Sequence, residues 1–274
     1  MLFSQDIIDA LKKLIFKVGQ EISKIYYDNS FSVYLKEDSS PVTNADMLAS
    51  EMIIASIRSI TPDIPIISEE MPISINLKIL EESKRYWLID PIDGTKSFIK
   101  KNGDFTINIA LIEEGRPVFG LIYHPIKHEL FYTNHEGKTI KETASSKDVI
   151  QVNKDINLEH GLNLLLPNRS IGKIGDRFVK AFKVKSSSKV SSSYKFCLLA
   201  EGKFDIYGNF ISIFLWDVAA GHAILNGAGG KIYHTSGEEL IYVSGSLYNP
   251  HFIAISSYIP PEYIKSILHN IKSE

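Results

Sequence analysis

The 274-residue chain has little of several features that define whole classes of protein. Its single cysteine, Cys197, excludes an internal disulfide framework and any zinc site built from several cysteines. Cys197 stands in an apolar run, FCLLA, so we expect a buried thiol. A net charge of −2 at pH 7 gives no reason to expect a nucleic-acid-binding protein, which would normally be basic. No apolar run is long enough to predict a transmembrane segment.

The N-terminal region does not resemble a secretory signal peptide either. Charged residues interrupt its apolar pattern at Asp6, Asp9, Lys12 and Lys13. We therefore expect a cytoplasmic protein, with peripheral association with the inner membrane left open. The sequence also leaves open whether the protein is a monomer or a homodimer.

What is present predicts a layered structure in two parts that form one compact unit. Residues 1–150 read as two helices followed by a mostly antiparallel sheet, and residues 151–274 alternate strands with helices, which favours an α/β layer. The polar segment 134–160 is the candidate boundary. The predicted helices are 6–27, 44–60, 174–182, 194–202, 216–230 and 261–272, and the predicted strands are 64–68, 85–89, 105–113, 117–124, 129–133, 163–167, 204–208, 231–234 and 252–256.

The stretch WLIDPIDGTKSF, residues 87–98, ends an apolar strand in two aspartates, Asp90 and Asp93. If such like charges lie close together, they repel one another unless a cation lies between them. Oxygen ligands without histidine or cysteine suit a hard ion such as Mg²⁺ or Mn²⁺. Further acidic residues also stand at the ends of predicted apolar elements: Asp46, Glu69, Glu70 and Asp217.

Each acidic residue alone also has a purely structural interpretation. Asp46 would complete a capping box with Thr43, and Asp217 would suit the first turn of a helix. Glu69 and Glu70 would form a solvated loop pair, and the two aspartates of DPID would be turn residues. The coincidence of all these placements favours a shared metal site.

The residues after Asp93 predict an anion site beside the carboxylates. Gly94 lets the backbone approach a ligand closely, and Thr95 opens the short segment TKSFIKK, which we expect to be helical. Free N–H groups at the start of a helix bind anions. Carboxylates for a metal next to N–H groups for a phosphate together imply phosphoryl chemistry.

The succession of SEE, DPIDGT and WDVAAG resembles the inositol monophosphatase superfamily of metal-dependent, often lithium-sensitive phosphatases. The segments PVTNAD, FIKKNGDFT, FCLLAEG and WDVAAGHA are similar to one branch, the bacterial 3′(2′),5′-bisphosphate nucleotidases of sulfur assimilation. The resemblance spans nearly the whole chain. It implies the α-β-α-β-α layered sandwich of the sugar phosphatases, an α+β or α/β fold. It also implies hydrolysis of the 3′-phosphate of 3′-phosphoadenosine 5′-phosphate to AMP and phosphate.

The resemblance also assigns roles to matching residues. Two Mg²⁺ ions are implied, the first held by Glu69, Asp90 and the Ile92 carbonyl and the second by Asp90, Asp93 and Asp217. Asp46 and Thr95 would orient the attacking water, with Glu70 and a third, weaker metal taking part. The implied substrate contacts are Glu69, Ile92, Asp93, Gly94, Thr95, Arg169, Lys195 and Asp217.

One departure from the branch affects the substrate prediction. After FDIYG the chain has Gly208–Asn209 and no proline, where the branch usually has a basic residue and a Gly-Pro turn. Arg169 and Lys195 are candidates for a second phosphate, or are ordinary surface cations. The alternatives are an inositol monophosphatase or sugar phosphatase of the same superfamily and a non-catalytic metal- or nucleotide-binding sensor. The intact set of acidic residues argues against the sensor.

Overall fold

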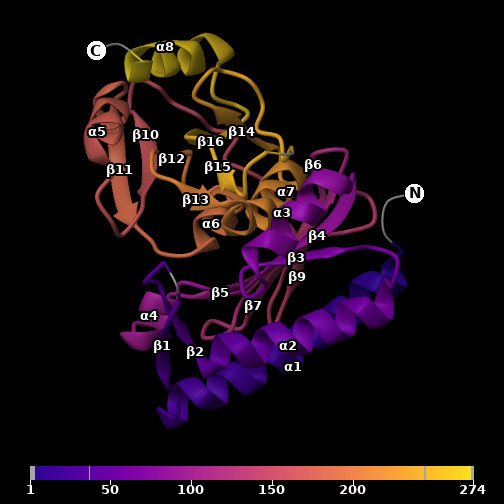
Figure 1. The fold of residues 1–274 in the computed structure, drawn as a ribbon. Helices are drawn as coiled ribbons and strands as arrows, with labels where there is room; N and C mark the ends of the chain where they lie inside the picture. The colour runs from indigo at the N-terminus through magenta and orange to yellow at the C-terminus, as the bar shows by residue number, and fades with distance from the viewer. Residues whose placement is uncertain (1–3, 37, 244, 273–274) are drawn as a thin grey trace.

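Two large β-sheets alternate with three layers of helices in the computed structural model, which describes residues 4–36, 38–243 and 245–272 (Figure 1). This is the expected α-β-α-β-α sandwich, so the predicted fold class is confirmed. The helical layers, in order, are α1 (Gln5–Asp28) with α2 (Asn44–Ile60), then α6 (Tyr194–Ala200) with α7 (Ala219–Gly227), then α5 (Gly172–Lys180) with α8 (Pro261–Lys272).

The larger sheet has seven strands, and all of its pairings are antiparallel except that of its first two strands. Along the second strand, Trp87 and Ile89 pack toward α1 and α2, whereas Leu88 faces the middle helical layer. This alternation follows from the pleat of a strand that is buried on both faces. In spatial order the strands are β3 (Ile66–Ser68), β4 (Arg85–Asp93), β5 (Thr106–Glu113), β6 (Arg116–His124), β7 (Glu129–Thr133), β8 (Thr139–Glu142) and β9 (Lys147–Val149).

The smaller sheet has five strands and mixes parallel with antiparallel pairs. Between the two sheets, Phe196 and Ile224 of the middle helices share one apolar core with Leu88 and Tyr207. In spatial order the strands are β11 (Val184–Lys189), β10 (Leu162–Leu166), β12 (Ile206–Asn209), β16 (Phe252–Ser256) and β14 (Gly230–His234).

Gly120 on β6 explains how closely the middle layer approaches the larger sheet. A Cβ atom at this position would lie 2.4 Å from the carbonyl oxygen of Ala220 on α7. Because no side chain fits this distance, the glycine permits helix and sheet to pack backbone against backbone. This packing holds the start of α7, and with it Asp217, close to the end of β4.

Some elements differ from the sequence prediction. Helix α3 (Ile73–Glu82) and strand β11 were not predicted, because α3 buries little besides Asn76 and Leu80 and β11 is a polar edge strand. The segment 216–230 is not one helix: the 3₁₀ turn η1 (Leu215–Asp217) comes before α7. The predicted boundary segment 134–160 carries β8 and β9 of the larger sheet.

Two further sequence predictions, on Cys197 and on transmembrane segments, can be compared with the described part of the chain. Cys197 is buried and free, as its apolar surroundings indicate. Among the described residues, the structure contains no helix with both the length and the hydrophobicity that a bilayer span needs.

Candidate metal centre and active site

The end of β4 brings Asp90 and Asp93 to the same side of the sheet. Residues three apart on a regular strand point to opposite faces. Here the register shifts: Asp90 pairs with Asn108 and Asp93 with Thr106, so β4 has one residue more than β5 over this span. Such a β-bulge turns both aspartates to one face, the face that looks toward the middle helical layer.

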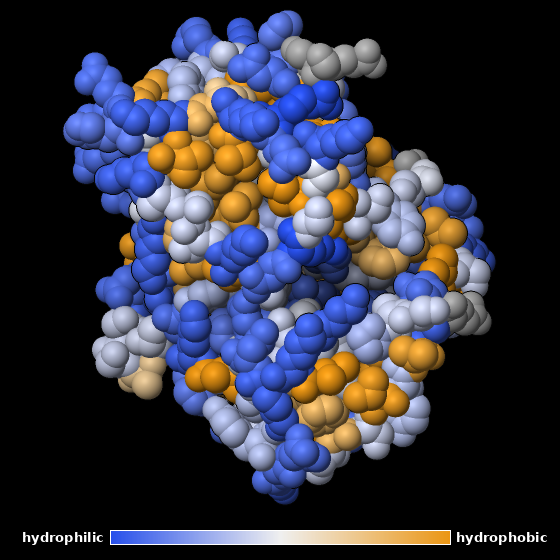
Figure 2. Space-filling view, turned by 90° about the vertical axis from the view of Figure 1, so that its left-hand side faces the viewer, coloured by the Kyte–Doolittle hydropathy of each residue, from blue (hydrophilic) through white to orange (hydrophobic). Residues whose placement is uncertain are grey.

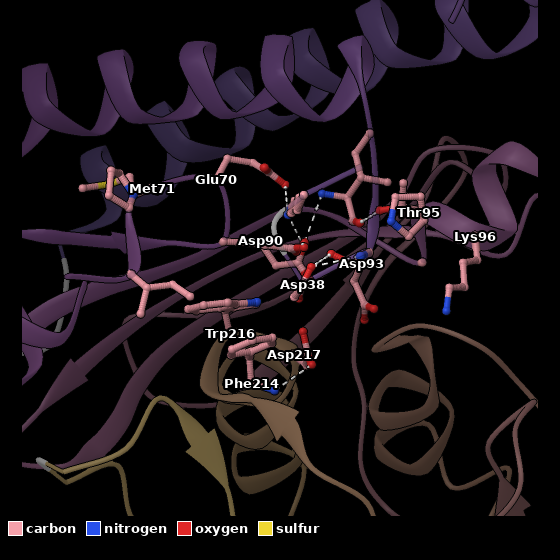
Figure 3. A pocket seen from close by; sticks show the side chains of 18 of the residues that line it. Asp38, Glu70, Met71, Asp90, Asp93, Thr95, Lys96, Phe214, Trp216 and Asp217 are labelled. Carbon is pink, nitrogen blue, oxygen red and sulfur yellow. Dashed lines mark hydrogen bonds and ion pairs between the residues drawn. The ribbon is translucent and has the colours of Figure 1, made fainter. Parts of the chain in front are cut away.

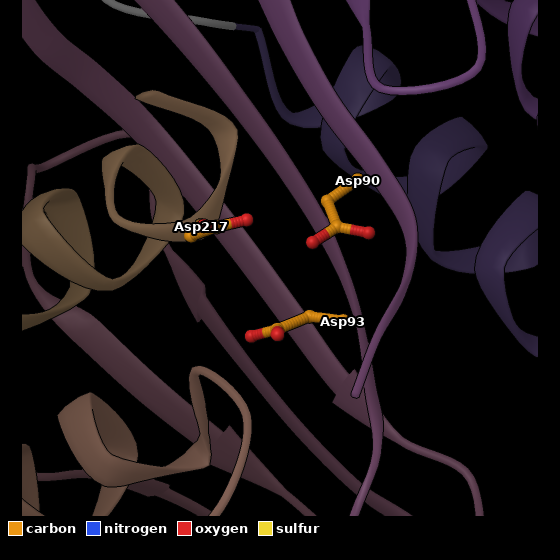
Figure 4. Close-up of side chains that lie close together, drawn as sticks. All are labelled: Asp90, Asp93 and Asp217. Carbon is orange, nitrogen blue, oxygen red and sulfur yellow. The ribbon is translucent and has the colours of Figure 1, made fainter. Parts of the chain in front are cut away.

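Asp217 reaches the same point from the other half of the chain. The turn η1, which ends at Asp217, packs against β4 and β5. One carboxylate oxygen from each of Asp90, Asp93 and Asp217 lies within 4.8 Å of the others, and Figure 4 shows the three side chains pointing toward one another. The backbone N–H of Phe214 donates to Asp217 Oδ2 at 3.0 Å and so orients this carboxylate.

Burial and mutual repulsion both act on these carboxylates. Burial, together with the charges of Glu69, Asp93 and Asp217, raises the pKa of Asp90 well above its ordinary range. Burial and the charge of Asp93 do the same to the pKa of Asp217. Asp90 Oδ1 accepts the Ile92 N–H at 3.1 Å, but Oδ2 has no donor among the described residues. A buried anionic oxygen without a donor, facing two more carboxylates, fits a site for a hard cation.

Glu69 and Glu70 follow β3 and lie at the edge of this cluster. The Lys36 Nζ lies 2.7 Å from Glu69 Oε1 and 2.8 Å from Glu70 Oε1. Burial raises the pKa of Glu70 to about 7, the charge of Glu69 adds to this, and Lys36 opposes it. Burial disfavours the charge on Lys36, but the two glutamates outweigh it and raise the pKa of its ammonium. The sequence analysis missed Lys36, because a lone lysine carries no signal until β1 (Val33–Leu35) pairs with β2 (Pro41–Thr43).

Asp46 has the predicted capping role and a second contact as well. Its Oδ2 accepts the Thr43 N–H at 2.7 Å and completes the capping box of α2. Its Oδ1 accepts the Thr95 hydroxyl at 3.0 Å, and the same hydroxyl lies 3.2 Å from the Ile92 carbonyl oxygen. Burial raises the pKa of Asp46, which the bonds from Thr43 partly offset. The structural interpretation of Asp46 therefore does not compete with a catalytic one.

Gly94 begins the short helix α4 (Thr95–Ile99) in a conformation that suits glycine. Its φ is +100°, and a Cβ atom there would lie 2.9 Å from the Asp104 carbonyl oxygen. The first N–H groups of a helix have no partner within the helix. The glycine thus turns this end of α4 toward the acidic cluster.

The cluster opens into a pocket of about 1130 Å³ (Figure 3). The face shown in Figure 2 is mostly hydrophilic and is hollowed between its upper and lower parts. The rings of Phe214 and Trp216 stack in the pocket wall with their centroids 4.5 Å apart, which the sequence analysis did not predict. Of the predicted site residues, the pocket is lined by Glu69, Glu70, Asp90, Ile92, Asp93, Gly94, Thr95, Arg169 and Asp217.

Two predicted site residues lie behind this wall. Asp46 is buried beneath Thr95. Lys195 is also buried, and its Nζ donates to the carbonyl oxygen of Ser192. Two further polar residues contact Asp93, namely Asn108 and Ser193. They were missed because their contacts arise only when β5 and the start of α6 meet.

The raised pKa values predict how Mg²⁺ should affect stability. Glu70 has a pKa of about 7 in the folded protein against an ordinary value of 4.5, so its contribution to stability is lost as the pH rises through 7. A bound cation favours the charged form of Glu70, and so it offsets the burial and the repulsion from Glu69 that cause this loss. We therefore expect Mg²⁺ to raise the melting temperature more at about pH 8 than at about pH 6. Glu70→Gln should weaken this pH dependence in differential scanning fluorimetry, and an equal Mg²⁺ effect at both pH values would contradict the prediction.

The layered fold and the three carboxylates that meet at an open pocket agree with the class of metal-dependent phosphatases. The chain matches the inositol monophosphatase family over residues 4–270. It therefore belongs to the inositol monophosphatase family, as its motifs indicate.

Individual relatives cover most of the chain. The chain is 37% identical over 247 residues to the 3′(2′),5′-bisphosphate nucleotidase CysQ of Salmonella typhimurium, covering 89% of this chain and 98% of the relative. It is 40% identical over 242 residues to the protein of the same name from Buchnera aphidicola, covering 86% and 87%. The crystal structure of CysQ from Bacteroides thetaiotaomicron superposes with a TM-score of 0.80 at 30% identity, covering 93% of this chain and 99% of that one.

Proposed function

We propose that this protein is a Mg²⁺-dependent 3′(2′),5′-bisphosphate nucleotidase that converts 3′-phosphoadenosine 5′-phosphate into AMP and phosphate. The convergence of Asp90, Asp93 and Asp217 in one pocket carries the phosphatase part of the proposal. The bisphosphate nucleotidases that resemble most of the chain support the choice of substrate. We place the enzyme in the cytoplasm and in sulfur assimilation, as a monomer or homodimer.

The site residues would divide the metal ions between them. Glu69, Asp90 and the Ile92 carbonyl would hold one Mg²⁺, and Asp90, Asp93 and Asp217 a second, with a third, weaker ion near Glu70. Bound Mg²⁺ supplies Lewis-acid stabilisation of phosphoryl oxygens and lowers the pKa of water. The unpartnered Oδ2 of Asp90, enclosed by the other carboxylates, is the observation that favours these ions.

The remaining residues would position the reactants. The Thr95 hydroxyl, held by Asp46 Oδ1, lies where it can orient the attacking water. The N–H groups of Gly94 and Thr95 would bind the phosphate that is hydrolysed, and Asp217 would also approach the sugar. The motif has no nucleophile elbow and its carboxylates would hold metal, so water would attack the phosphorus directly, with no covalent intermediate on the protein.

A second phosphate would meet the cationic side of the pocket. Arg169 and Lys96 line the pocket, so they can reach a substrate group directly. Lys195, buried behind the wall and bonded to Ser192, would act on such a phosphate through its charge. The unusual 208–215 segment places Phe214 in the pocket wall, so a flat apolar group can lie on this side.

The substrate proposal is tested by kcat/KM for 3′-phosphoadenosine 5′-phosphate and for inositol 1-phosphate at matched Mg²⁺. We expect the nucleotide to be preferred by about 10- to 150-fold, because a charge-assisted contact to a remote phosphate is worth about 1.5–3 kcal/mol. Arg169→Ala should reduce this preference, whereas Arg58→Ala, on the exposed face of α2, should not. Equal turnover of both substrates would leave only the family assignment, with an inositol or sugar phosphate as substrate. Metal binding with no turnover of any phosphate monoester would favour the sensor.

Lithium offers an independent check in the same assay. Li⁺ is close to Mg²⁺ in size but carries half the charge, so it can fill a magnesium position without supporting the reaction. We expect LiCl to inhibit turnover relative to KCl at equal ionic strength, in a manner that depends on the Mg²⁺ concentration. Identical rates in both salts would count against this metal site.

A further inference from the structure

The hydroxyl of Ser193 lies where the two halves of the acidic cluster meet. Its Oγ is 2.6 Å from Asp93 Oδ2 and 2.7 Å from the backbone carbonyl oxygen of Asp217. The amide Nδ2 of Asn108 donates to the same Oγ at 2.9 Å. Ser193 is 1% exposed, so water does not compete for these contacts. A single side chain therefore links β4, β5 and η1.

The contacts of Ser193 determine how Asp93 presents its carboxylate. A hydroxyl bond to an ionised carboxylate is charge-assisted, and such O–H···O⁻ bonds are typically about 2.5–2.7 Å long. Here the bond occupies Oδ2, which the Asn108 amide also approaches at 3.5 Å. With Oδ2 engaged by two donors, Oδ1 of Asp93 is the oxygen left to face a cation. Such partners of metal ligands fix the orientation of the ligand.

The segment that carries Ser193 is itself held in place at both preceding residues. The N–H of Ser191 donates to Asp104 Oδ2 at 2.6 Å. Ser192 adopts a φ of +50°, and its carbonyl oxygen accepts the Nζ of the buried Lys195. These bonds prevent the segment from shifting, so the position of the Ser193 hydroxyl is set by the fold and not by the ligand.

We propose that Ser193 is a positioning residue that sets both the orientation of Asp93 and its distance from Asp217 for metal binding. Its Oγ contacts both the side chain of Asp93, in the larger sheet, and the backbone carbonyl oxygen of Asp217, in η1. The hydroxyl has one proton, and the Asp93 carboxylate and the Asp217 carbonyl are both acceptors that share it. Without the hydroxyl, Asp93 Oδ2 keeps only the long Asn108 contact and the Asp217 carbonyl loses its share of this donor. The proposal rests on the proposed metal centre, but binding of a metal alone tests it without any turnover.

The experiment compares Ser193→Ala with Ser192→Ala by titrating Mn²⁺ and following the electron paramagnetic resonance of the free ion. Loss of a partner that orients a metal ligand typically costs about 10–100-fold in metal affinity. We expect a loss of this size for Ser193→Ala and less than about twofold for Ser192→Ala. The matched control removes a neighbouring hydroxyl that accepts the Tyr194 N–H at 3.4 Å. Ser193→Cys keeps the size but donates weakly, so it should also bind Mn²⁺ more weakly while folding normally.

A purely structural role would have a different signature. It would lower the melting temperature of the metal-free protein and leave Mn²⁺ affinity unchanged. Mn²⁺ affinity within about twofold of the original protein in either folded Ser193 variant would overturn the proposal. Failure of the proposed function would show separately, as inactivity of the unaltered protein toward 3′-phosphoadenosine 5′-phosphate despite normal Mn²⁺ binding.

Discussion

Asp90→Asn should abolish metal-dependent turnover and make the metal-free protein more stable. The change keeps the side chain's shape, and its remaining oxygen can still accept the Ile92 N–H that Asp90 accepts at 3.1 Å. It removes a charge that is disfavoured by burial and by repulsion from Glu69, Asp93 and Asp217, the two effects that raise the Asp90 pKa. Relief of that repulsion should raise the melting temperature without metal, by roughly 2–4 °C for each kcal/mol gained. Because Asp90 would contact both metal ions, kcat should fall by about 10³-fold or more.

The two readouts together separate a metal role from a folding role. A residue needed only for folding would lose activity and stability together, whereas Asp90→Asn should move them in opposite directions. Asp176→Asn, on the exposed surface of α5, is the matched control and should change neither. Near-normal Mg²⁺-dependent turnover in Asp90→Asn would show that the two-metal assignment is wrong.

Thr95→Val should lower kcat by about 100-fold or more with little change in metal affinity. Valine matches threonine in shape but cannot donate to Asp46 Oδ1, which the Thr95 hydroxyl contacts at 3.0 Å. The attacking water would lose its partner, and Asp46 would keep its capping bonds from Thr43. Single-turnover rates at saturating Mg²⁺ and the Mn²⁺ titration provide the two measurements.

A matched threonine is available for comparison with Thr95. Thr143→Val lies in the loop after β8, where the described contacts of the Thr143 hydroxyl are all to residues 145 and 146 of the same loop. It should leave kcat unchanged. A Thr95→Val enzyme with unaltered kcat would remove Thr95 from the reaction, and one that no longer binds metal would place its role in the metal centre.

Much of this site could be predicted from sequence because its ligands stand at the ends of strongly apolar elements. The strand before Asp90 and the helix after Asp217 are buried on both sides, so their patterns are clear. The capping box at Asp46 is equally local, and the structure confirms it. Contacts between residues that are far apart in the sequence leave no such local pattern. Lys36 and Ser193 were missed because each contacts site residues at least 24 positions away, through pairings that no single segment encodes.

Lys195 shows where a sequence leaves the surroundings of a charge open. The sequence analysis offered Lys195 as a candidate for a second phosphate or as a surface cation, and the fold leaves it only 8% exposed and bonded to the Ser192 carbonyl. Flanking aromatic residues at 194 and 196 were a signal of burial. The weakly apolar elements α3 and β11 were missed for a related reason, since few of their side chains enter a core.

The bulge at the end of β4 makes the length of the DPID motif as important as its letters. Successive side chains of a strand point to opposite faces, so one added or deleted residue exchanges the inward and outward positions that follow it. Asp90 and Asp93 are three residues apart, and the extra residue of the bulge between them makes both side chains point to the same face. Deleting a residue at 91 or 92 would remove the bulge and restore the regular pairing with β5. The two carboxylates would then still point to one face, as residues two apart on a strand do, but the distance between them would change. Replacing Ile92 by another buried aliphatic residue keeps the count, and the backbone carbonyl there is present whatever the side chain. The motif thus fixes both the direction and the separation of its two carboxylates, and substitutions at positions 91 and 92 should be better tolerated than changes in the length of the motif.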